Sequence, residues 1–384
     1  VYEIPQALTD TESVFEHAAR ALDRSLRFGA HGLPLMGAGD WNDGMNRVGI
    51  EGKGESVWLA WFQVSMLEPM AVLAAQRGET TRAAHWRTAR THLLQAIETH
   101  GWDGAWYRRA FFDDGSALGS AANAECKIDL IAQAWAVLAG GGDASRARQA
   151  LQSAADHLID NDANLVRLLD PPLAEQHPSA GYIQAYPRGV RENGGQYTHA
   201  AAWASMAFAQ SGDAARAWQA WQAASPAHRM NDARQFAAYR LEPYAVAGDV
   251  YGHAPWRGQG GWSWYTGAAG WLLRAGVESL LGVQRRAALV RFAPLLPPEW
   301  PAAQVTLRWK GHEHVFDLVR DAGTGQRVLI AGTWLDLDTL HENTQWTVHL
   351  RPPMSLRPTA AASGPHHAFS SAGSTVASPQ EQPT

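Results

Sequence analysis

The chain has 384 residues, a formal net charge of −5 at pH 7, one cysteine and 18 tryptophans. Hydrophobic residues make up 46% and charged residues 18%, which is the composition of a folded globular chain rather than a disordered one. The single cysteine, Cys126, excludes an internal disulfide framework and a cysteine-based zinc site. The slightly acidic charge argues against a nucleic-acid partner, because phosphate contacts need a basic surface.

The first three quarters of the chain carry helical patterns. Apolar residues recur at helical spacing within 11–28, after Asp10 or Thr11 as a capping residue. The same spacing predicts further helices at 55–77, 80–99, 127–138, 144–158, 199–210, 214–224 and 267–281. Long polar and aromatic loops join them, which is typical of stacked helix pairs in a toroid or solenoid. The chain has no run of about 18 uncharged apolar residues, so no membrane span is expected.

The pattern changes near Gly282, where alternating and β-branched runs begin and predict a small all-β module. The runs are 289–292, 305–309, 314–319, 328–330 and 346–350. The last residues are rich in Ser, Ala, Pro and Gln, which is typical of a disordered tail. We therefore predict a helical domain at 1–283, a β-domain at 284–357 and a disordered tail at 358–384.

A glycine-rich loop at 37–46 holds the strongest candidate for a chemical site. Asp40 and Asp43 flank the indole of Trp41, so one short loop offers a stacking face for a sugar ring and carboxyl groups beside it. The alternative is a turn in which the aspartates cap backbone amides. A calcium loop is rejected, because Met45 stands where an EF-hand needs glycine.

Two other loops lead into helices. Residues 189–199 contain Arg191 and Glu192 and end at His199, where the amides of a helix start favour an anion. A capping or core-edge histidine and a surface ion pair are the alternatives. Residues 258–267 end at Thr266 and Gly267, whose hydroxyl and amide groups suit a phosphate. An aromatic turn capped by the threonine is the alternative there.

Eight stretches in order along the chain are similar to glycoside hydrolase family 94, the inverting sugar phosphorylases, and in particular to the phosphorylase-like domain at the C-terminus of cyclic β-1,2-glucan synthases. They are GLPLMGAGDWNDGMN (32–46), GKGESVWLAWF (52–62), WYRRAFFDDGSALGS (106–120), ECKIDLIAQAWAVLAG (125–140), GVRENGGQYTHAAAWA (189–204), LEPYAVAGDVY (241–251), GGWSWYTGAAGW (260–271) and LPPEWP (296–301). The resemblance implies an (α/α)6 barrel followed by a small all-β C-terminal domain. Only 39 residues precede Asp40, so the first helices of the barrel, and an arginine that binds phosphate, are expected to be missing.

The resemblance also implies the site residues. The general acid would be Asp43, the substrate contacts Trp41, Asp40, Arg191 and Glu192, and the phosphate contacts His199, Thr266 and Gly267. Asp40 is either the carboxylate that neighbours the acid or a residue that shapes the loop. Burial or a neighbouring carboxylate would keep the acid protonated.

The implied reaction is cleavage of β-glucan, β-1,2-linked by the resemblance, by phosphate with inversion to α-glucose 1-phosphate. An inverting phosphorylase needs an acid but no base, because phosphate is already an anionic nucleophile. We expect no metal or organic cofactor and inorganic phosphate as co-substrate. The alternatives are an inverting glycosidase, with Glu192 or Glu242 as base, and a non-catalytic glucan-binding fragment.

The expected partners are a β-glucan oligosaccharide and phosphate, together with upstream synthase domains or a second copy of the chain. We expect a cytoplasmic location, with attachment to the inner membrane through upstream domains as an alternative.

Overall fold

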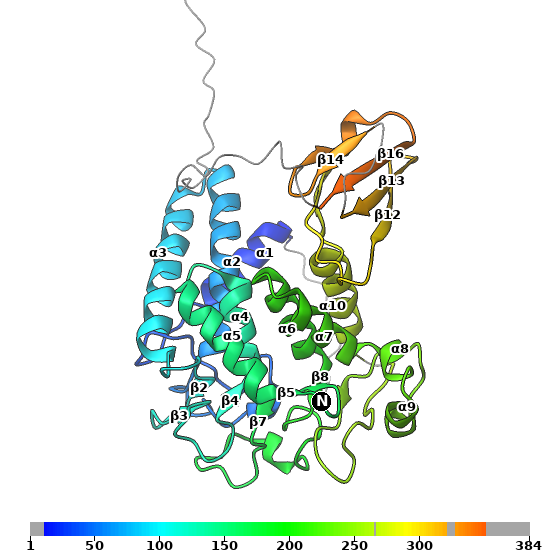
Figure 1. Ribbon diagram of the computed structural model, residues 1–384. Coiled ribbons are helices and arrows are strands. Elements are labelled where there is room, and N and C mark those ends of the chain that lie inside the picture. The colour runs from blue at the N-terminus through cyan, green and yellow to red at the C-terminus, as the bar shows by residue number, and fades with distance from the viewer. Residues whose placement is uncertain (1–10, 265, 321–326, 351–384) are drawn as a thin grey trace, which may run out of the picture.

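The computed structural model describes residues 11–264, 266–320 and 327–350. Helices fill the earlier part of the described chain and longer strands the later part (Figure 1). The α-helices are α1 (Val14–Ser25), α2 (Val57–Gln76), α3 (Thr80–Ala96), α4 (Leu130–Ala139), α5 (Ala144–Leu158), α6 (Thr198–Gln210), α7 (Ala214–Ala224), α8 (Pro226–Arg229), α9 (Ala233–Tyr239) and α10 (Ala268–Arg274). Each helix predicted from hydrophobic spacing is confirmed, whereas the short α8 and α9 were not predicted.

The long helices form two layers. Helices adjacent in the sequence pair as α2 with α3, α4 with α5 and α6 with α7, while α2, α4, α6 and α10 contact one another in succession. The inner helices are apolar around their circumference, whereas α5 buries one stripe, Ala147, Ala150, Leu151, Ala154, Ala155 and Leu158. This is the arrangement expected of paired helices in an (α/α) barrel. The described residues contain three such pairs and α10, and an (α/α)6 barrel that lacks its first helices stays a prediction.

The helix α2 also has the length and hydropathy of a membrane-spanning helix. Its apolar window has a mean hydropathy of 1.4, so among the described residues it is the one candidate by length and composition. The sequence had led us to expect no span. Half of that window is buried inside the fold, where α2 packs on α3 and α4. Burial of this kind is what the core helix of a layered fold requires.

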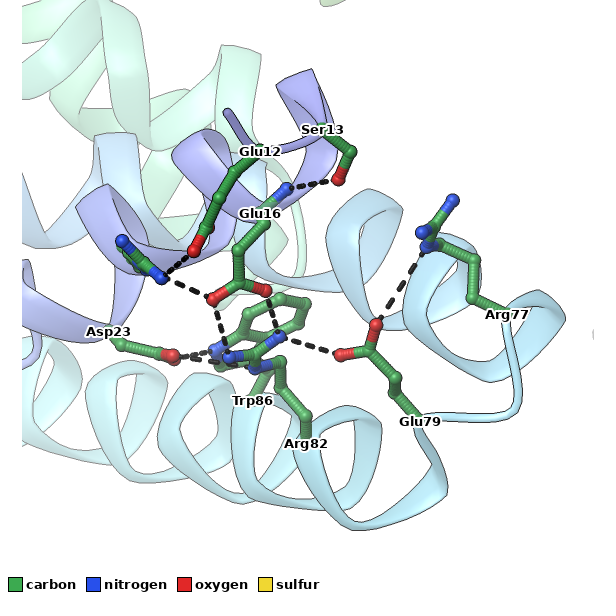
Figure 2. Close-up of polar contacts among 9 residues, drawn as sticks. Glu12, Ser13, Glu16, Asp23, Arg77, Glu79, Arg82 and Trp86 are labelled. Carbon is green, nitrogen blue, oxygen red and sulfur yellow. Dashed lines mark hydrogen bonds and ion pairs between the residues drawn. The ribbon is translucent and has the colours of Figure 1, made fainter. Parts of the chain in front are cut away.

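A network of charged side chains ties α1 to α3 (Figure 2). The guanidinium of Arg82, on α3, lies 2.9 Å from Glu16 and 3.4 Å from Asp23, both on α1, and 2.6 Å from Glu79. The indole of Trp86 donates a hydrogen bond to Asp23 (2.6 Å). Because two helices supply the charges, the network fixes how α1 lies against α3.

Short strands gather at one end of the helices, away from the larger sheet (Figure 1). They are β1 (Glu55–Ser56), β2 (Ala110–Phe111), β3 (Ala117–Leu118), β4 (Ile128–Asp129), β5 (Ile159–Asp160), β6 (Leu165–Val166), β7 (Leu169–Asp170), β8 (Gln196–Tyr197) and β9 (Asp249–Val250). The strands β1, β4 and β8 run directly into the inner helices α2, α4 and α6. This end of the fold therefore brings together loops that are far apart in the sequence.

The later strands enclose a second hydrophobic core. They are β10 (Val283–Arg286), β11 (Leu289–Phe292), β12 (Ala302–Trp309), β13 (His312–Val319), β14 (Val328–Ile330), β15 (Leu335–Asp336) and β16 (Thr344–His349). Their sheet orders are β10-β11-β15 and β12-β13-β16-β14, and Phe292, Phe316 and Val348 are buried between them. All five predicted strand runs fall on these strands. The predicted tail at 358–384 lies outside the described residues, and the division into domains stays a prediction.

Candidate functional site

A cavity of about 480 Å³ lies where the chain enters α6. The strand β8 pairs with β9, which places Tyr197 opposite Asp249 and brings the loop after β9 against the start of α6. The amide of Thr198 donates to the carbonyl of Gly248 (3.0 Å), which closes this junction. The cavity is lined by Arg191, Tyr197, His199, Gly248, Asp249, Trp262, Trp264, Thr266 and Gly267.

One wall of the cavity is suited to an anion. A Cβ on Gly267 would lie 3.2 Å from Nε2 of His199, so a larger residue would press on the imidazole. Burial lowers the pKa of His199, so the ring is neutral at pH 7, and its buried Nδ1 has no hydrogen-bond partner among the described residues. Oγ1 of Thr266 accepts from the amide of Ala268 (3.0 Å), and its hydroxyl proton stays free to donate. The wall thus offers neutral donors.

Positive charge enters the cavity from Arg191. Its φ of +52° is in the left-handed region, which is unfavourable for a residue with a side chain. Its guanidinium lies over the rings of Tyr186 (5.1 Å) and Trp262 (5.8 Å). A strained backbone held by surrounding contacts is a common feature of functional sites.

The carboxylate that holds Arg191 is Asp249, which was not among the predicted site residues. It accepts hydrogen bonds from the amides of Arg191 (3.0 Å) and Trp262 (3.2 Å), and so joins two walls of the cavity. Burial raises the pKa of Asp249. Its loop mixes acidic and aromatic residues, but the pairing of β8 with β9 that places it here is a long-range contact that no local pattern reveals.

Glu192, next to the cavity-lining Arg191, interacts electrostatically with Asp43. Glu192 is buried, with Oε2 3.5 Å from Nε of Arg191. Burial raises the pKa of Glu192, and the charge of Asp43 adds to the rise. Burial and a hydrogen bond to Asp43 together raise the pKa of Tyr182 to about 12. Asp43 itself is exposed. Asp43 is therefore not buried, contrary to one of the two expectations for it, and a carboxyl group that interacts with it is Glu192.

Asp40 shapes the loop and does not line the cavity. Its side chain is fully buried and forms a two-pronged ion pair with Arg109, at 2.7 Å for each oxygen. It also accepts from the hydroxyl of Ser56 (2.6 Å) and from the amide of Asn42 (3.0 Å). Because its oxygens are occupied by these donors, direct contact of Asp40 with a sugar does not fit this geometry. Of the two roles considered for it, the loop-shaping one agrees with the structure.

Trp41 lies behind the wall of the cavity. Its ring meets those of Tyr197 (5.3 Å), His199 (5.9 Å) and Trp203 (5.1 Å), and it is half-buried. The inner helices supply the remaining indoles of this cluster, Trp58, Trp135, Trp203 and Trp271. Much of the tryptophan excess is therefore core, whereas Trp262 and Trp264 at the cavity are more than half exposed.

The structure thus brings most of the predicted residues together. The cavity is lined by Arg191, His199, Thr266 and Gly267, and Trp41 and Glu192 contact its lining residues. Asp43 interacts electrostatically with Glu192. Among the described residues, no group of three or more His, Cys, Asp and Glu side chains is arranged to hold a metal ion.

Comparison with known proteins defines the class. Residues 2–282 match the model for the catalytic domain of the glycosyl hydrolase 94 superfamily, so the chain belongs to this family of carbohydrate-active enzymes. The matched region ends where the longer strands begin, at Val283.

The family resemblance extends to particular enzymes. The chain is 46% identical over 326 residues to cyclic β-(1,2)-glucan synthase NdvB of Rhizobium meliloti (strain 1021), which covers 85% of this chain and 12% of that protein. It is 31% identical to 3-O-β-D-glucopyranosyl-β-D-glucuronide phosphorylase and to solabiose phosphorylase of Paenibacillus borealis, over 82% of this chain and 41% of each relative. The chain therefore spans less than half the length of these relatives.

Two solved structures have a similar fold. A sialidase superposes with a TM-score of 0.52 at 13% identity, over 78% of this chain and 27% of its own. A GH78 family rhamnosidase of Bacillus sp. GL1 superposes with a TM-score of 0.50 at 16% identity, over 88% of this chain and 31% of its own. At these identities the similarity concerns the fold alone.

Proposed function

We propose that the chain is a phosphorylase domain that cleaves β-1,2-linked glucan with inorganic phosphate and inversion, releasing α-glucose 1-phosphate, as part of a protein like the cyclic glucan synthases. The observation that carries the proposal is the cavity itself, which has an anion-suited wall at His199, Thr266 and Gly267 and, at Arg191, contacts Glu192, the carboxyl group on which Asp43 acts electrostatically. Two relatives support the linkage and the use of phosphate, since one is named a cyclic β-(1,2)-glucan synthase and the other a phosphorylase.

In this mechanism the exposed carboxyl of Asp43 donates its proton to the glycosidic oxygen as the bond from that oxygen to the anomeric carbon breaks. Phosphate, held by the donors of His199, Thr266 and Gly267 with the charge of Arg191 nearby, attacks the anomeric carbon from the opposite face. The new carbon–oxygen bond inverts the configuration, and the proton leaves on the released sugar hydroxyl. Acid and nucleophile complete the chemistry, so we propose no metal or organic cofactor.

Glu192 would orient the sugar. Burial raises its pKa and so favours the protonated form, which can donate to a sugar oxygen, whereas the ionised form can accept from a sugar hydroxyl. Trp41, which abuts His199, would support the ring at the cleavage point.

The presence of two carboxyl groups that interact electrostatically, Asp43 and Glu192, also supports a second candidate, an inverting hydrolase in which Glu192 activates water. The two differ in their need for phosphate. A hydrolase releases glucose in phosphate-free buffer, whereas the phosphorylase forms α-glucose 1-phosphate only when phosphate is added.

The test is to incubate β-1,2-linked gluco-oligosaccharides with phosphate and follow products by ¹H and ³¹P NMR, which identify the anomer. We expect Asp43→Asn to lower phosphorolysis by about 10²- to 10⁴-fold, because it removes the proton donor. Asp156→Asn, an exposed change on α5, is the matched control and should keep the wild-type rate. The assay is run on the 384-residue chain and on a longer protein that contains it.

Two outcomes would contradict the proposal. A near-normal rate for Asp43→Asn would show that the acid is another residue. Binding of the oligosaccharide without turnover in both the chain and the longer protein would indicate a glucan-binding unit, and Asp43→Asn would then leave that binding intact.

A further inference from the structure

A second polar cavity, of about 310 Å³, lies between the loop after β5, the helices α8 and α9, and the turn at Arg257 and Gly258. It shares no lining residue with the candidate functional site. Its wall contains Arg229 at the end of α8 and Gln235 in α9, with Asp162 and Asp232 also lining it.

The guanidinium of Arg229 is buried without an anion. The residue is 1% exposed, and no ion pair to it occurs among the described residues. Its Nη2 donates to the carbonyl of Asn164 (2.6 Å), whereas its buried Nε has no hydrogen-bond partner there. Burial lowers the pKa of Arg229 to about 10, and the one group that opposes this is Tyr239, whose ring lies 5.7 Å away. Neither aspartate at the cavity compensates the charge.

The two fully buried arginines of the described residues differ in this respect. Arg109 is held by Asp40 and Asp129, whereas Arg229 has no ion pair there. Arg257, at the same cavity as Arg229, pairs with Asp160. An isolated buried charge costs several kcal/mol unless an opposite charge meets it. A cavity beside such a charge is therefore a place for an anion from outside the chain.

The cavity also holds an acceptor without a donor. The side-chain oxygen Oε1 of Gln235 is buried and has no hydrogen-bond partner among the described residues. Only the backbone amide of Gln235 is paired with the cavity residue Asp232, to whose carboxylate it donates (2.8 Å). The unpaired donor is Nε of Arg229 and the unpaired acceptor is Oε1 of Gln235. A ligand that satisfies both has an oxyanion near Arg229 and a hydroxyl group near Gln235.

We propose that this cavity is a second binding site, for a phosphorylated sugar, with the phosphate group on Arg229 and sugar hydroxyls on Gln235 and Asp162. An arginine fork matches phosphate oxygens, and acid and amide side chains match hydroxyls. The volume exceeds what a lone phosphate needs. The inference does not depend on the proposed reaction, because the two cavities have separate walls.

The test is calorimetric titration of the His199→Ala chain, in which the candidate functional site is weakened, with glucose 6-phosphate, inorganic phosphate and glucose. We expect one equivalent of glucose 6-phosphate to bind. Adding Arg229→Met should weaken binding about tenfold or more, as expected when charge-assisted hydrogen bonds are lost. Arg87→Met, an exposed arginine on α3, is the matched control and should not change the affinity.

The arms of the experiment separate the sources of the phosphate group. We expect Gln235→Leu to weaken glucose 6-phosphate but not inorganic phosphate, and glucose alone to bind least. Equal affinities for inorganic phosphate and glucose 6-phosphate, unaffected by Gln235→Leu, would overturn the sugar part of the proposal. Absence of binding, or binding unchanged by Arg229→Met, would overturn the site. If Arg229→Met does not fold, the site is tested by Gln235→Leu, on the short and exposed α9. An unchanged affinity of Gln235→Leu for glucose 6-phosphate would then overturn the site.

Discussion

A chain of buried charges supports the loop that carries Asp43. Arg109 has both nitrogens of its fork on Asp40 and its Nε 3.4 Å from Asp129, and all three side chains are removed from solvent. The two carboxyl groups respond in opposite directions. Despite burial, Arg109 and Ser56 hold the pKa of Asp40 below its ordinary value, whereas burial raises the pKa of Asp129 to about 6. Arg109 therefore stabilises the charge of one partner much more than that of the other.

The raised pKa of Asp129 predicts a pH dependence. Between about pH 4 and pH 6 the native state keeps a proton that the unfolded chain releases, so this residue's contribution to stability falls as the pH rises through that window. Asp129 caps α4 by accepting a hydrogen bond from the amide of Ile131, and asparagine can accept the same bond. Because asparagine does not titrate, Asp129→Asn removes the pH dependence that Asp129 causes. We expect its free energy of unfolding in urea to rise relative to wild type from about pH 4 to pH 6 and to level off above.

The control for this experiment is Asp156→Asn, whose unfolding free energy should follow wild type at every pH. Parallel curves for Asp129→Asn and wild type would show that Asp129 is ionised throughout.

Local sequence could not reveal these partners. The glycine-rich loop marked Asp40 as chemically active, but its ion pair is with a residue 69 positions away, and only the packed fold brings them together. For the same reason Asp249 was not predicted, since strand pairing places it. His199, Thr266 and Gly267 were predicted to lie near one another through family resemblance, and their place at helix starts was visible in the sequence itself.

At the scale of elements, hydrophobic periodicity predicted every long helix. The periodicity is strong there because the buried face of a helix determines where its apolar residues lie. The apolar stripe of α5 and the continuous apolar surface of α4 both follow from how many neighbours each helix has. Short elements were missed, namely α8, α9 and the two-residue strands at the site end. A strand of two residues carries no period, so its place depends on tertiary contacts alone.

The charged network on α3 predicts how firmly α1 is held. Arg82→Gln removes the contacts to Glu16 and Asp23, which are part of a partly exposed network, so the expected loss is about 0.5–1 kcal/mol. We expect hydrogen exchange of the α1 amides to accelerate roughly two- to fivefold, and the effect to shrink in high salt.

Arg87→Gln provides the comparison, because Arg87 is on the same helix but pairs with Glu68 on α2. It should leave α1 exchange unchanged. Equal acceleration in both variants would mean that α1 is held by its apolar contacts rather than by charge.

At the scale of the whole molecule, two hydrophobic cores meet at a small junction. The helical core and the core of the later strands are distinct clusters. Between them, the indole of Trp218 on α7 donates to the carbonyl of Leu295 and its ring lies 5.1 Å from that of Trp300. This junction links the stability of one core to that of the other.

Trp300→Ala tests that link. The loss of an aromatic pair of this kind is about 0.5–1.5 kcal/mol, so we expect amides of β12, β13 and β16 to exchange roughly two- to tenfold faster. Amides of α2 and α4 should be unaffected. Uniform acceleration across helices and strands would show a single cooperative unit instead.

The ion pair between Asp40 and Arg109 has a consequence for biosynthesis. While the ribosome has made the glycine-rich loop but not the segment that carries Arg109, the carboxylate of Asp40 has no guanidinium to bind and the loop has no fixed shape. Arg109 in turn is contacted by Asp129, at the start of α4, so the full set of three charges needs the chain through Asp129. A nascent or truncated chain that stops before α4 would display the residues of the loop without their arrangement. The loop that carries Asp43 thus gains this ion pair only after the segment that follows α3 has been made.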